Sequence, residues 1–275
     1  MKECDSLFIK IYAAAAAAAD ILICALGAVR EFSDIWIPVV LFMAFFIGLS
    51  LLHLTVTFIM SLFIKLDKPC DVPDKFCRFW VFGTVGFVLD LARVRITVNG
   101  AEKLPHDRRF LLVSNHRSNL DPMIGIVKFY KNEIAYVAKP EVLKFPIVGP
   151  FIHKCCFLSI DRENARNAMR TIHRATDFVK NDITSIGIYP EGTRSKTGEL
   201  LEFKDGVFYI AKKAPCPVAV ITVKGTENLS KNLPFKSTKV LINVLGVIEP
   251  EEFADLSTHE LGEKVREMML ADLGK

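Results

Sequence analysis

A histidine and an aspartate in one short polar motif have the residue types and the spacing needed to activate a hydroxyl group. The motif runs from Asn115 to Asp121, with four residues between His116 and Asp121. A carboxylate on one ring nitrogen fixes the tautomer and stabilises the imidazolium, so the other nitrogen can take a proton from a hydroxyl. Asp121 precedes Pro122, and such a pair commonly starts a helix with Asp as the cap. We expect the loop to bring Asp121 to His116, although this motif taken alone favours a plain cap.

A second polar motif, Glu191-Gly192-Thr193-Arg194, begins 75 residues after His116 and has the groups of a phosphate site. Gly192 permits a tight turn with outward backbone amides, and Thr193 offers a hydroxyl. Arg194 offers a planar donor fork that matches phosphate oxygens. Glu191 is an anion, so we expect it to brace Arg194 or the loop. Taken alone, this motif favours a surface turn with an ion pair.

Both motifs follow apolar runs that are typical of buried strands, Phe110–Val113 before the first and Ile186–Tyr189 before the second. Strands are expected at Val94–Val98, Phe110–Ser114, Ile134–Val137, Phe157–Ile160, Ser185–Tyr189, Val218–Val223 and Val240–Val244. Helices are expected between most of them, for example at Asn164–Lys180 and Gly206–Lys213, and at Ser257–Leu273 with Ser257 and Glu260 as a capping box. This alternation predicts an α/β fold, with a mixed sheet of about seven strands flanked by helices. In such sheets functional groups gather where strands end, which is the position of both motifs.

A hydrophobic region precedes the predicted sheet. Ile35–Ile64 contains no Asp, Glu, Lys or Arg and is long enough to span a bilayer as a helix. A second apolar run, Ile11–Val29, includes seven consecutive alanines, Ala13–Ala19. Residues 1–92 are therefore predicted to be a membrane-anchoring region with one or two transmembrane helices, and residues 93–275 the catalytic domain. Phe76–Leu91 fits an interfacial helix and a core helix equally well.

The charge and the cysteines of the chain indicate its binding partners, its membrane topology and its redox compartment. The formal net charge of +4 suits an anionic membrane surface, an acidic carrier or a phosphate substrate, and no nucleic-acid motif is present. Basic residues precede the first apolar run and follow the second, at Lys2, Lys10, Lys65, Lys68, Lys75 and Arg78. The positive-inside rule then places both ends of the anchor in the cytoplasm. The seven cysteines lack metal-type spacing and are predicted to be free thiols in a reducing compartment.

These residues together resemble a known family, the glycerophospholipid acyltransferases, and specifically the bacterial 1-acylglycerol-3-phosphate acyltransferases. The family motif NHxxxxD is matched by Asn115, His116 and Asp121, and the motif EGTR by the four residues from Glu191 to Arg194. Other motif positions are matched in the family's order by Lys139, Pro140, Pro146, Gly149, Ile160, Asp161, Arg162, Phe203, Lys204 and Gly206. The chain departs from the pattern at Lys154-Cys155-Cys156, where the family has a glycine, and at Val220, where it has a second proline.

The resemblance implies an enzyme that moves an acyl group from a thioester, acyl-CoA or acyl carrier protein, to the free hydroxyl of lysophosphatidate. His116 would be the general base and Asp121 its orienting carboxylate. Arg194 with Thr193 and Gly192 would bind the acceptor phosphate, with Glu191 in the same loop and with Lys204 and Arg162 assisting. It implies no metal and no cofactor. The enzyme is expected at the cell membrane, among membrane lipids, with its catalytic domain on the cytoplasmic face.

Three alternatives stay open on the sequence. A sibling acyltransferase would use glycerol-3-phosphate or another lyso-lipid with the same motifs. A metal-dependent phosphoesterase would use His116 and Asp121 as ligands, and a lipid-binding membrane protein would use them without catalysis. Arg166, Arg170 and Arg174 recur every four residues and share one helix face, which is either solvated or docks an anionic carrier or headgroup.

Overall fold

Seven strands form one mixed sheet, as the sequence predicts. The computed structural model describes residues 7–66 and 69–274, so Lys2, Cys4 and Lys68 lie outside the described residues. The strands are β1 (Val94–Asn99), β2 (Leu111–Ser114), β3 (Ile134–Ala138), β4 (Leu158–Ser159), β5 (Ser185–Ile188), β6 (Val218–Lys224) and β7 (Thr238–Ile248). Their order is β1-β7-β6-β2-β5-β3-β4. Only β6 and β7 pair antiparallel, so β2, β3, β4, β5 and β6 all run in one direction.

Two strands differ in length from the sequence prediction because of their neighbours. β4 is an edge strand that pairs only through Leu158 and Ser159, so the predicted run Phe157–Ile160 shortens to two residues. β7 has 11 residues because its first half pairs with β1 and nearly its whole length pairs with β6. Backbone pairing with neighbouring strands thus determines strand length beyond what local apolar runs indicate.

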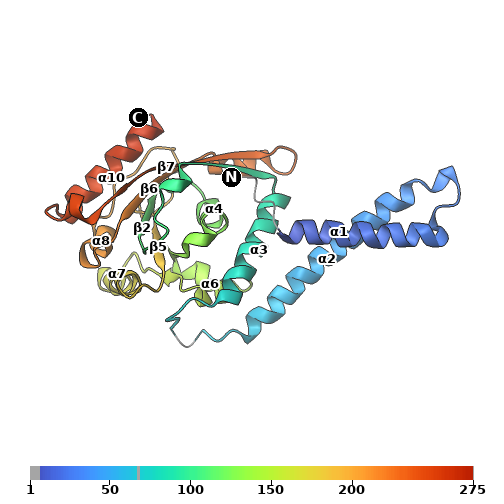
Figure 1. The fold of residues 1–275 in the computed structure, drawn as a ribbon, viewed down its shortest axis with the longest axis horizontal. Helices are drawn as coiled ribbons and strands as arrows, with labels where there is room; N and C mark the ends of the chain where they lie inside the picture. Colours follow the sequence, from blue (N-terminus) through green and yellow to red (C-terminus); the bar gives the residue numbers. More distant parts are fainter. Residues whose placement is uncertain (1–6, 67–68, 275) are drawn as a thin grey trace.

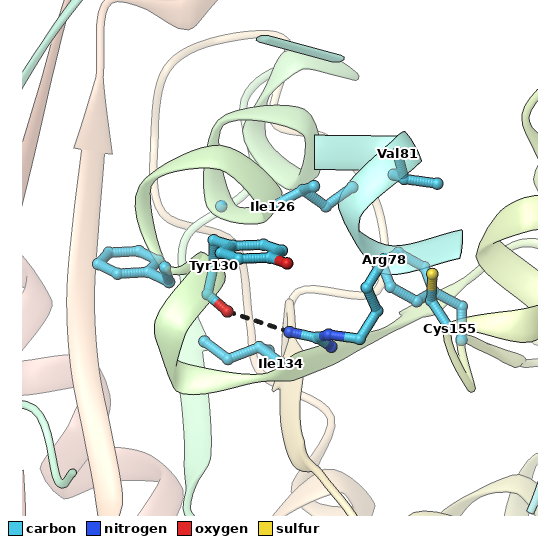
Figure 2. Close-up of a pocket in the computed structure, with 9 residues that line it drawn as sticks. Arg78, Val81, Ile126, Tyr130, Ile134 and Cys155 are labelled. Atoms are coloured by element: carbon cyan, nitrogen blue, oxygen red, sulfur yellow. Dashed lines mark hydrogen bonds between the residues drawn. The ribbon is translucent and has the colours of Figure 1, made fainter. Parts of the chain in front are cut away.

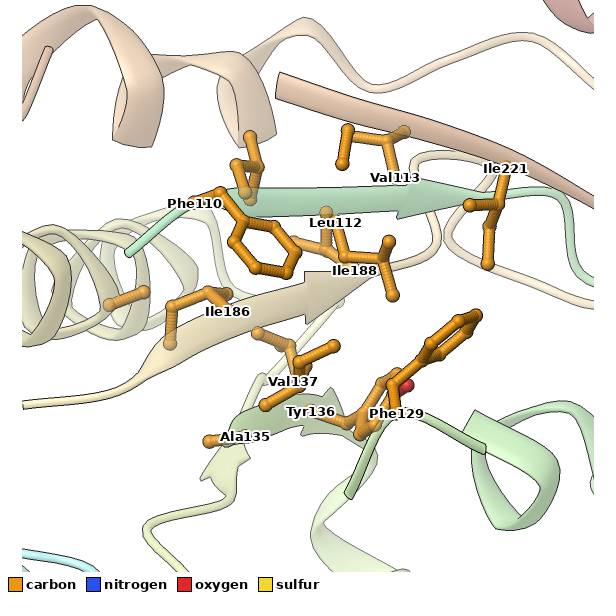
Figure 3. Close-up of a cluster of buried hydrophobic side chains, with 14 of the residues drawn as sticks. Phe110, Leu112, Val113, Phe129, Ala135, Tyr136, Val137, Ile186, Ile188 and Ile221 are labelled. Atoms are coloured by element: carbon orange, nitrogen blue, oxygen red, sulfur yellow. The ribbon is translucent and has the colours of Figure 1, made fainter. Parts of the chain in front are cut away.

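The central strands are buried on both faces, which explains their continuous apolar runs. Figure 3 shows Leu112 and Val113 of β2 with Ile186 and Ile188 of β5 in one cluster, and all four are at most 4% exposed. Burial of each such side chain contributes about 1.5–3 kcal/mol. Gly187 is required here, because a Cβ at this position would lie 2.5 Å from Cε1 of Tyr136.

Helices cover both faces of the sheet (Figure 1). They are α4 (Leu120–Lys128), α5 (Pro140–Leu143), α6 (Gly149–Lys154), α7 (Ala165–Lys180), α8 (Tyr209–Lys213), α9 (Leu229–Asn232) and α10 (Thr258–Leu273). The capping box predicted for the last helix is confirmed, with Ser257 and Glu260 bonding each other's backbone amides. The predicted helix Gly206–Lys213 divides into a 3-10 turn, Asp205–Phe208, followed by α8.

The apolar N-terminal region forms a helical hairpin that projects from the α/β domain (Figure 1). Its helices are α1 (Leu7–Ile23) and α2 (Trp36–Phe63), and the described residues contain two helical segments long and apolar enough to cross a membrane, Leu7–Ala28 and Trp36–Phe63. At 1.5 Å per residue, α2 is about 42 Å long, more than a hydrocarbon core of about 30 Å. His53 of α2 is buried, with hydrogen bonds to Tyr12 (2.8 Å) and to Thr84 (3.1 Å), which ties the two hairpin helices to the next helix.

Helix α3 (Lys75–Leu91) joins the hairpin to the sheet and has properties of both kinds of helix predicted for it. Val81 and Val85 on one face belong to the buried core, whereas Phe76 is 51% exposed. Figure 2 shows Arg78 of α3 donating to the carbonyl of Tyr130 at 3.1 Å, beside a cavity of about 20 Å³. The domain boundary between residues 92 and 93 stays a prediction. Helix α3 precedes this boundary in the chain but packs into the core of the α/β domain.

Candidate active site

The two polar motifs meet at one edge of the sheet. β2 and β5 are parallel neighbours, with Leu111 opposite Ile186, so the loops that follow them leave the same edge. The Glu191 carboxylate accepts the backbone N–H of His116 at 2.6 Å through Oε1 and that of Leu201 at 3.0 Å through Oε2. The backbone N–H of Ser195 donates to the carbonyl of His116 at 2.9 Å. The EGTR loop therefore holds the backbone of His116 directly.

His116 and Asp121 form the predicted contact. The Nδ1 of His116 lies 2.8 Å from Oδ2 of Asp121, and the two side chains are 12% and 1% exposed. Because a carboxylate accepts hydrogen bonds, Nδ1 carries the proton and Nε2 is the nitrogen able to accept one. Within the described part of the chain, no hydrogen bond engages Nε2. The ring is thus oriented with its basic nitrogen available to a substrate.

Asp121 is held by a different local structure from the predicted helix cap. α4 begins at Leu120, so Asp121 lies in the first turn, and Asn119 at the cap position makes no side-chain capping bond. Oδ2 of Asp121 instead accepts from the backbone N–H groups of Arg117 at 2.7 Å and of Ser118 at 2.8 Å. These amides lie before the helix, and the loop curls so that they converge with the imidazole on one oxygen. The carboxylate therefore orients the loop and the ring together.

Asn115 fixes the end of β2 from the other side. Its side chain donates to the carbonyl of Val223 at 2.9 Å and accepts from the N–H of the same residue at 2.7 Å. This pair of bonds joins the first motif to β6, while Glu191 joins it to the loop after β5. The backbone beside His116 is thereby held between strand β6 and the loop that follows β5.

Tyr189 is a site residue that the motifs do not include. Its ring stacks on the imidazole of His116, with centroids 4.3 Å apart and planes 22° apart, and its other neighbour is the ring of Tyr136 at 6.2 Å. Desolvation raises the pKa of Tyr189 well above its ordinary value, so the phenol stays neutral. The only sequence signal for Tyr189 is an aromatic residue where the predicted strand Ser185–Tyr189 ends.

A cavity of about 720 Å³ opens beside this edge, between α7 and the loop after β5. Its polar lining includes Arg162, Thr193 and Lys204, together with Gly192 and Glu191 of the second motif. The apolar part of the lining includes Ala165, Ala168, Met169 and Ile172 of α7, together with Val137, Ile160, Ile188, Pro190, Leu201 and Val207. Tyr189 also lines it, so this ring contacts both the cavity and His116.

The structure separates Arg194 from the other predicted phosphate ligands. Arg194 is exposed and does not line the cavity, whereas Arg162 and Lys204 do. Gly192 has φ of +68°, a left-handed conformation that favours glycine, and its N–H donates to the carbonyl of Tyr189 at 3.0 Å. Lys204 returns to this turn through a bond from its N–H to the carbonyl of Pro190 at 2.9 Å. The turn thus places Lys204 and Gly192 on the cavity side.

Glu191 was expected to brace Arg194 or its own loop, and it does hold backbone groups of the site, but none of its described hydrogen bonds goes to Arg194. Its residue is 3% exposed, and both carboxylate oxygens accept backbone amides of His116 and Leu201 rather than the guanidinium of Arg194. Desolvation raises the pKa of Glu191, while those two bonds oppose the shift by favouring the charged form. The buried carboxylate therefore holds the backbone of His116 and that of Leu201 in place. Among the described residues, no three His, Cys, Asp or Glu side chains are grouped as metal ligands.

Comparison with known proteins agrees with the motifs. Residues 95–224 match the model of a protein family described as Acyltransferase. The 1-acyl-sn-glycerol-3-phosphate acyltransferase of Borreliella burgdorferi is 28% identical over 185 residues, which are 66% of this chain and 73% of that protein. The human 1-acyl-sn-glycerol-3-phosphate acyltransferase alpha is 27% identical over 179 residues, or 64% of this chain. The matched segment spans only 63% of the human protein's length.

A solved structure shows the same fold. The crystal structure of the 1-acyl-sn-glycerophosphate (LPA) acyltransferase PlsC from Thermotoga maritima superposes with a TM-score of 0.57 at 23% sequence identity. The superposition covers 80% of this chain and 87% of the other. The predicted α/β fold is therefore confirmed both by the seven-stranded sheet and by this likeness.

Proposed function

We propose that the acyltransferase-family domain at residues 95–224 of this chain transfers a fatty acyl group from a thioester to the free secondary hydroxyl of lysophosphatidate. The observation that carries this proposal is the 2.8 Å contact between Nδ1 of His116 and Oδ2 of Asp121, which leaves Nε2 open. The names of the similar proteins support the substrate class.

The reaction follows from the geometry of the imidazole. Nε2 of His116 takes the proton of the acceptor hydroxyl as its oxygen attacks the carbonyl carbon of the thioester. Asp121 stabilises the imidazolium that forms. The carbon–sulfur bond then breaks, and the imidazolium returns the proton to the departing sulfur. The products are phosphatidate and the free thiol of the carrier, which is coenzyme A or acyl carrier protein.

The cavity lined by Tyr189 and Glu191 supplies the acceptor site in this proposal. His116 does not itself line this cavity but contacts both of those residues. Arg162 and Lys204 line it with Thr193, and such charged donors bind phosphate through short hydrogen bonds. The apolar residues of α7 and the strand ends on the rest of its lining suit a hydrocarbon chain. Arg194 would contact the phosphate from the exposed rim of the same turn.

The apolar hairpin supports a membrane location for this site. Only 11% and 6% of the most apolar stretch of its two candidate spans is buried within the protein, so most of these side chains are at least partly uncovered. A bilayer would cover them, and the acceptor, a lipid, lies in the same membrane. The charge distribution around the hairpin supports a catalytic domain on the cytoplasmic face.

The purified full-length chain in lipid nanodiscs tests the proposal directly. With one acyl donor, we expect acyl transfer to lysophosphatidate to exceed transfer to glycerol-3-phosphate and to other lyso-lipids, and to survive a chelator. Preference for another acceptor would assign the chain to a sibling acyltransferase. Activity lost with the chelator would favour metal-dependent chemistry. Offering acyl-CoA and acyl carrier protein in parallel identifies the donor.

Substitutions in the cavity should act on the acceptor. Lys204→Ala and Arg162→Ala each remove a charged hydrogen bond of about 1.5–3 kcal/mol, so the KM for lysophosphatidate should rise about 10- to 100-fold. The KM for the donor should change much less. Arg194→Ala should also raise the acceptor KM more than the donor KM, and equal effects on both would contradict its role in phosphate binding. Lys196→Ala, exposed in the same loop, is the matched control.

A further inference from the structure

Two cysteines from distant parts of the chain touch each other outside the proposed active site. The Sγ atoms of Cys70 and Cys156 lie 2.8 Å apart, although 86 residues separate them in sequence. Cys70 lies between α2 and α3, and Cys156 lies between α6 and the edge strand β4. A disulfide has a sulfur–sulfur distance of about 2.05 Å, so closing the bond requires the sulfurs to approach by only about 0.8 Å.

The surrounding backbone holds this pair together. Arg174 of α7 donates to the carbonyl of Cys70 at 2.8 Å and to Asp71 at 3.2 Å. The backbone N–H of Asp74 donates to the carbonyl of Lys154 at 2.8 Å, which fixes the segment before α3 against the end of α6. These contacts, at or after Cys70 in the chain and before Cys156, thus hold the two cysteines next to each other. Arg174 is not part of a solvated arginine face, because it anchors this segment.

Both cysteines line one cavity of about 580 Å³, which is distinct from the cavity lined by Tyr189 and Lys204. Arg170, Arg174 and His173 line it, with Asp177 as the acidic group. The cationic side suits a small anionic molecule. Among the described residues no third Cys, His, Asp or Glu completes a metal-binding group, which leaves thiol chemistry as what the pair can do.

The two thiols differ in reactivity. The hydrogen bond from Cys156 lowers the pKa of Cys70 to about 7, and the same contact, followed by desolvation, raises the pKa of Cys156. Burial raises the pKa of Cys77 to about 12 and that of Cys216 to about 12. Thiolates, not thiols, attack disulfides. Cys70 is also only half-buried, whereas Cys156 is 1% exposed, so Cys70 is the accessible nucleophile and Cys156 the buried partner.

We propose that Cys70 and Cys156 form a reversible dithiol site that reacts with small anionic disulfides of the glutathione type. The Cys70 thiolate attacks one sulfur of the disulfide, which gives a mixed disulfide on Cys70 and releases one thiolate. Cys156, losing its proton to solvent, then attacks Sγ of Cys70 and releases the second thiolate. Two protein thiols are oxidised to one protein disulfide, and one small disulfide is reduced to two thiols. Disulfides that form in a reducing compartment are usually transient and redox-sensing.

The bond would connect two parts of the fold. Cys70 belongs to the segment that leaves the membrane hairpin, and Cys156 precedes β4, after which the chain reaches Arg162 of the proposed acceptor cavity. Oxidation would therefore tie the exit of the anchor to the edge of the catalytic sheet. This inference does not depend on the proposed acyl transfer, because its readout is the state of the thiols.

The full-length chain in nanodiscs, exposed to glutathione disulfide and then alkylated and digested, tests the site by mass spectrometry. We expect a peptide pair cross-linked through Cys70 and Cys156, and its loss on return to reduced glutathione. Cys156→Ser should trap glutathione on Cys70, whereas Cys70→Ser should leave Cys156 without an adduct. Cys155→Ser is the matched control, because this neighbour faces the small cavity beside Arg78 and should not affect the cross-link (Figure 2).

The wild-type chain gives a second readout that needs no substitution. Because the contact with Cys156 lowers the pKa of Cys70 to about 7, whereas burial raises those of Cys77 and Cys216 to about 12, a thiolate-selective alkylating agent should label Cys70 at least tenfold faster than Cys77 or Cys216. Equal labelling rates, or an adduct on Cys156 that forms as fast in Cys70→Ser as the cross-link forms in wild type, would overturn the proposal. So would the absence of the cross-linked pair when glutathione disulfide has modified other cysteines.

Discussion

His116→Ala should lower kcat for acyl transfer to lysophosphatidate by about 10³-fold, because a positioned general base contributes about 10²- to 10⁴-fold. Nε2 is the only ring nitrogen free to take the proton, since Nδ1 is bound to Asp121 at 2.8 Å. The KM for the acceptor should change little, because the cationic residues that line the cavity remain. Initial rates with varied lysophosphatidate at saturating donor separate the two parameters.

Controls for this substitution must separate chemistry from folding. His116→Gln keeps a polar side chain of similar reach under the ring of Tyr189 but has no basic nitrogen, so it should be as inactive as His116→Ala. His106→Ala removes an exposed histidine and should retain wild-type activity. Circular dichroism and thermal unfolding should show the same fold for all three variants. Activity above about a tenth of wild type in both His116 variants would remove His116 from the proposed mechanism and favour a binding role.

The general architecture and the meeting of the two polar motifs at one edge of the sheet were predictable from local patterns. Apolar runs identified β2, β3, β5 and β6 because interior parallel strands are buried on both faces and read as continuous hydrophobic segments, whereas β1 and β7 alternate between buried and more exposed side chains. The position of the motifs just after β2 and β5 indicated a shared edge, and the parallel pairing of these strands accounts for it. The capping box at Ser257 was predictable because its two hydrogen bonds depend on residues only three positions apart.

Features that depend on tertiary contacts were not predictable in the same way. Nothing local to Asp121 indicates that the N–H groups of Arg117 and Ser118 would converge on its carboxylate instead of a helix cap. Glu191 was expected to brace Arg194 or its own loop. It holds the loop through the N–H of Leu201, but its other partner, the backbone of His116, lies 75 residues away and was not predictable from the motif. The ring of Tyr189 gains its role only when β5 lies beside β2. Such pairings are set by sheet order, which local sequence patterns do not encode.

The contact between Cys70 and Cys156 was likewise not predictable from local sequence. Their sequence spacing matches no metal or redox motif, and the pair was predicted to consist of ordinary free thiols. The contact exists because the exit of the hairpin packs along the end of α6, as the bond between Asp74 and Lys154 shows. Cys156 is one of the positions at which the chain departs from the motif pattern that it otherwise resembles. Cys70 lies in the irregular segment between α2 and α3, and only the fold brings the two cysteines together.

Asp121→Asn should lower kcat by about 100-fold while leaving the site assembled. The amide oxygen of asparagine can take the place of Oδ2 and accept from Nδ1 of His116 and from the amides of Arg117 and Ser118. The NH₂ group then occupies the place of Oδ1, a buried atom without a hydrogen-bond partner among the described residues, so no existing bond is broken there. What is lost is the negative charge that stabilises the imidazolium, a contribution of about 3 kcal/mol, which corresponds to about 100-fold in rate.

The companion variant Asp121→Ala separates orientation from charge. Alanine removes all three hydrogen bonds to Oδ2, so His116 loses its fixed tautomer and the loop loses its anchor. We expect Asp121→Ala to be less active than Asp121→Asn and less stable by about 1–3 kcal/mol in urea unfolding. Asp107→Asn, at a carboxylate that is 85% exposed, controls for the change of charge. Because Asn preserves the geometry and Ala does not, equal kcat values in the two variants would mean that charge alone matters. Wild-type kcat in Asp121→Asn would mean that orientation alone matters, and that His116 needs no carboxylate to act as the base.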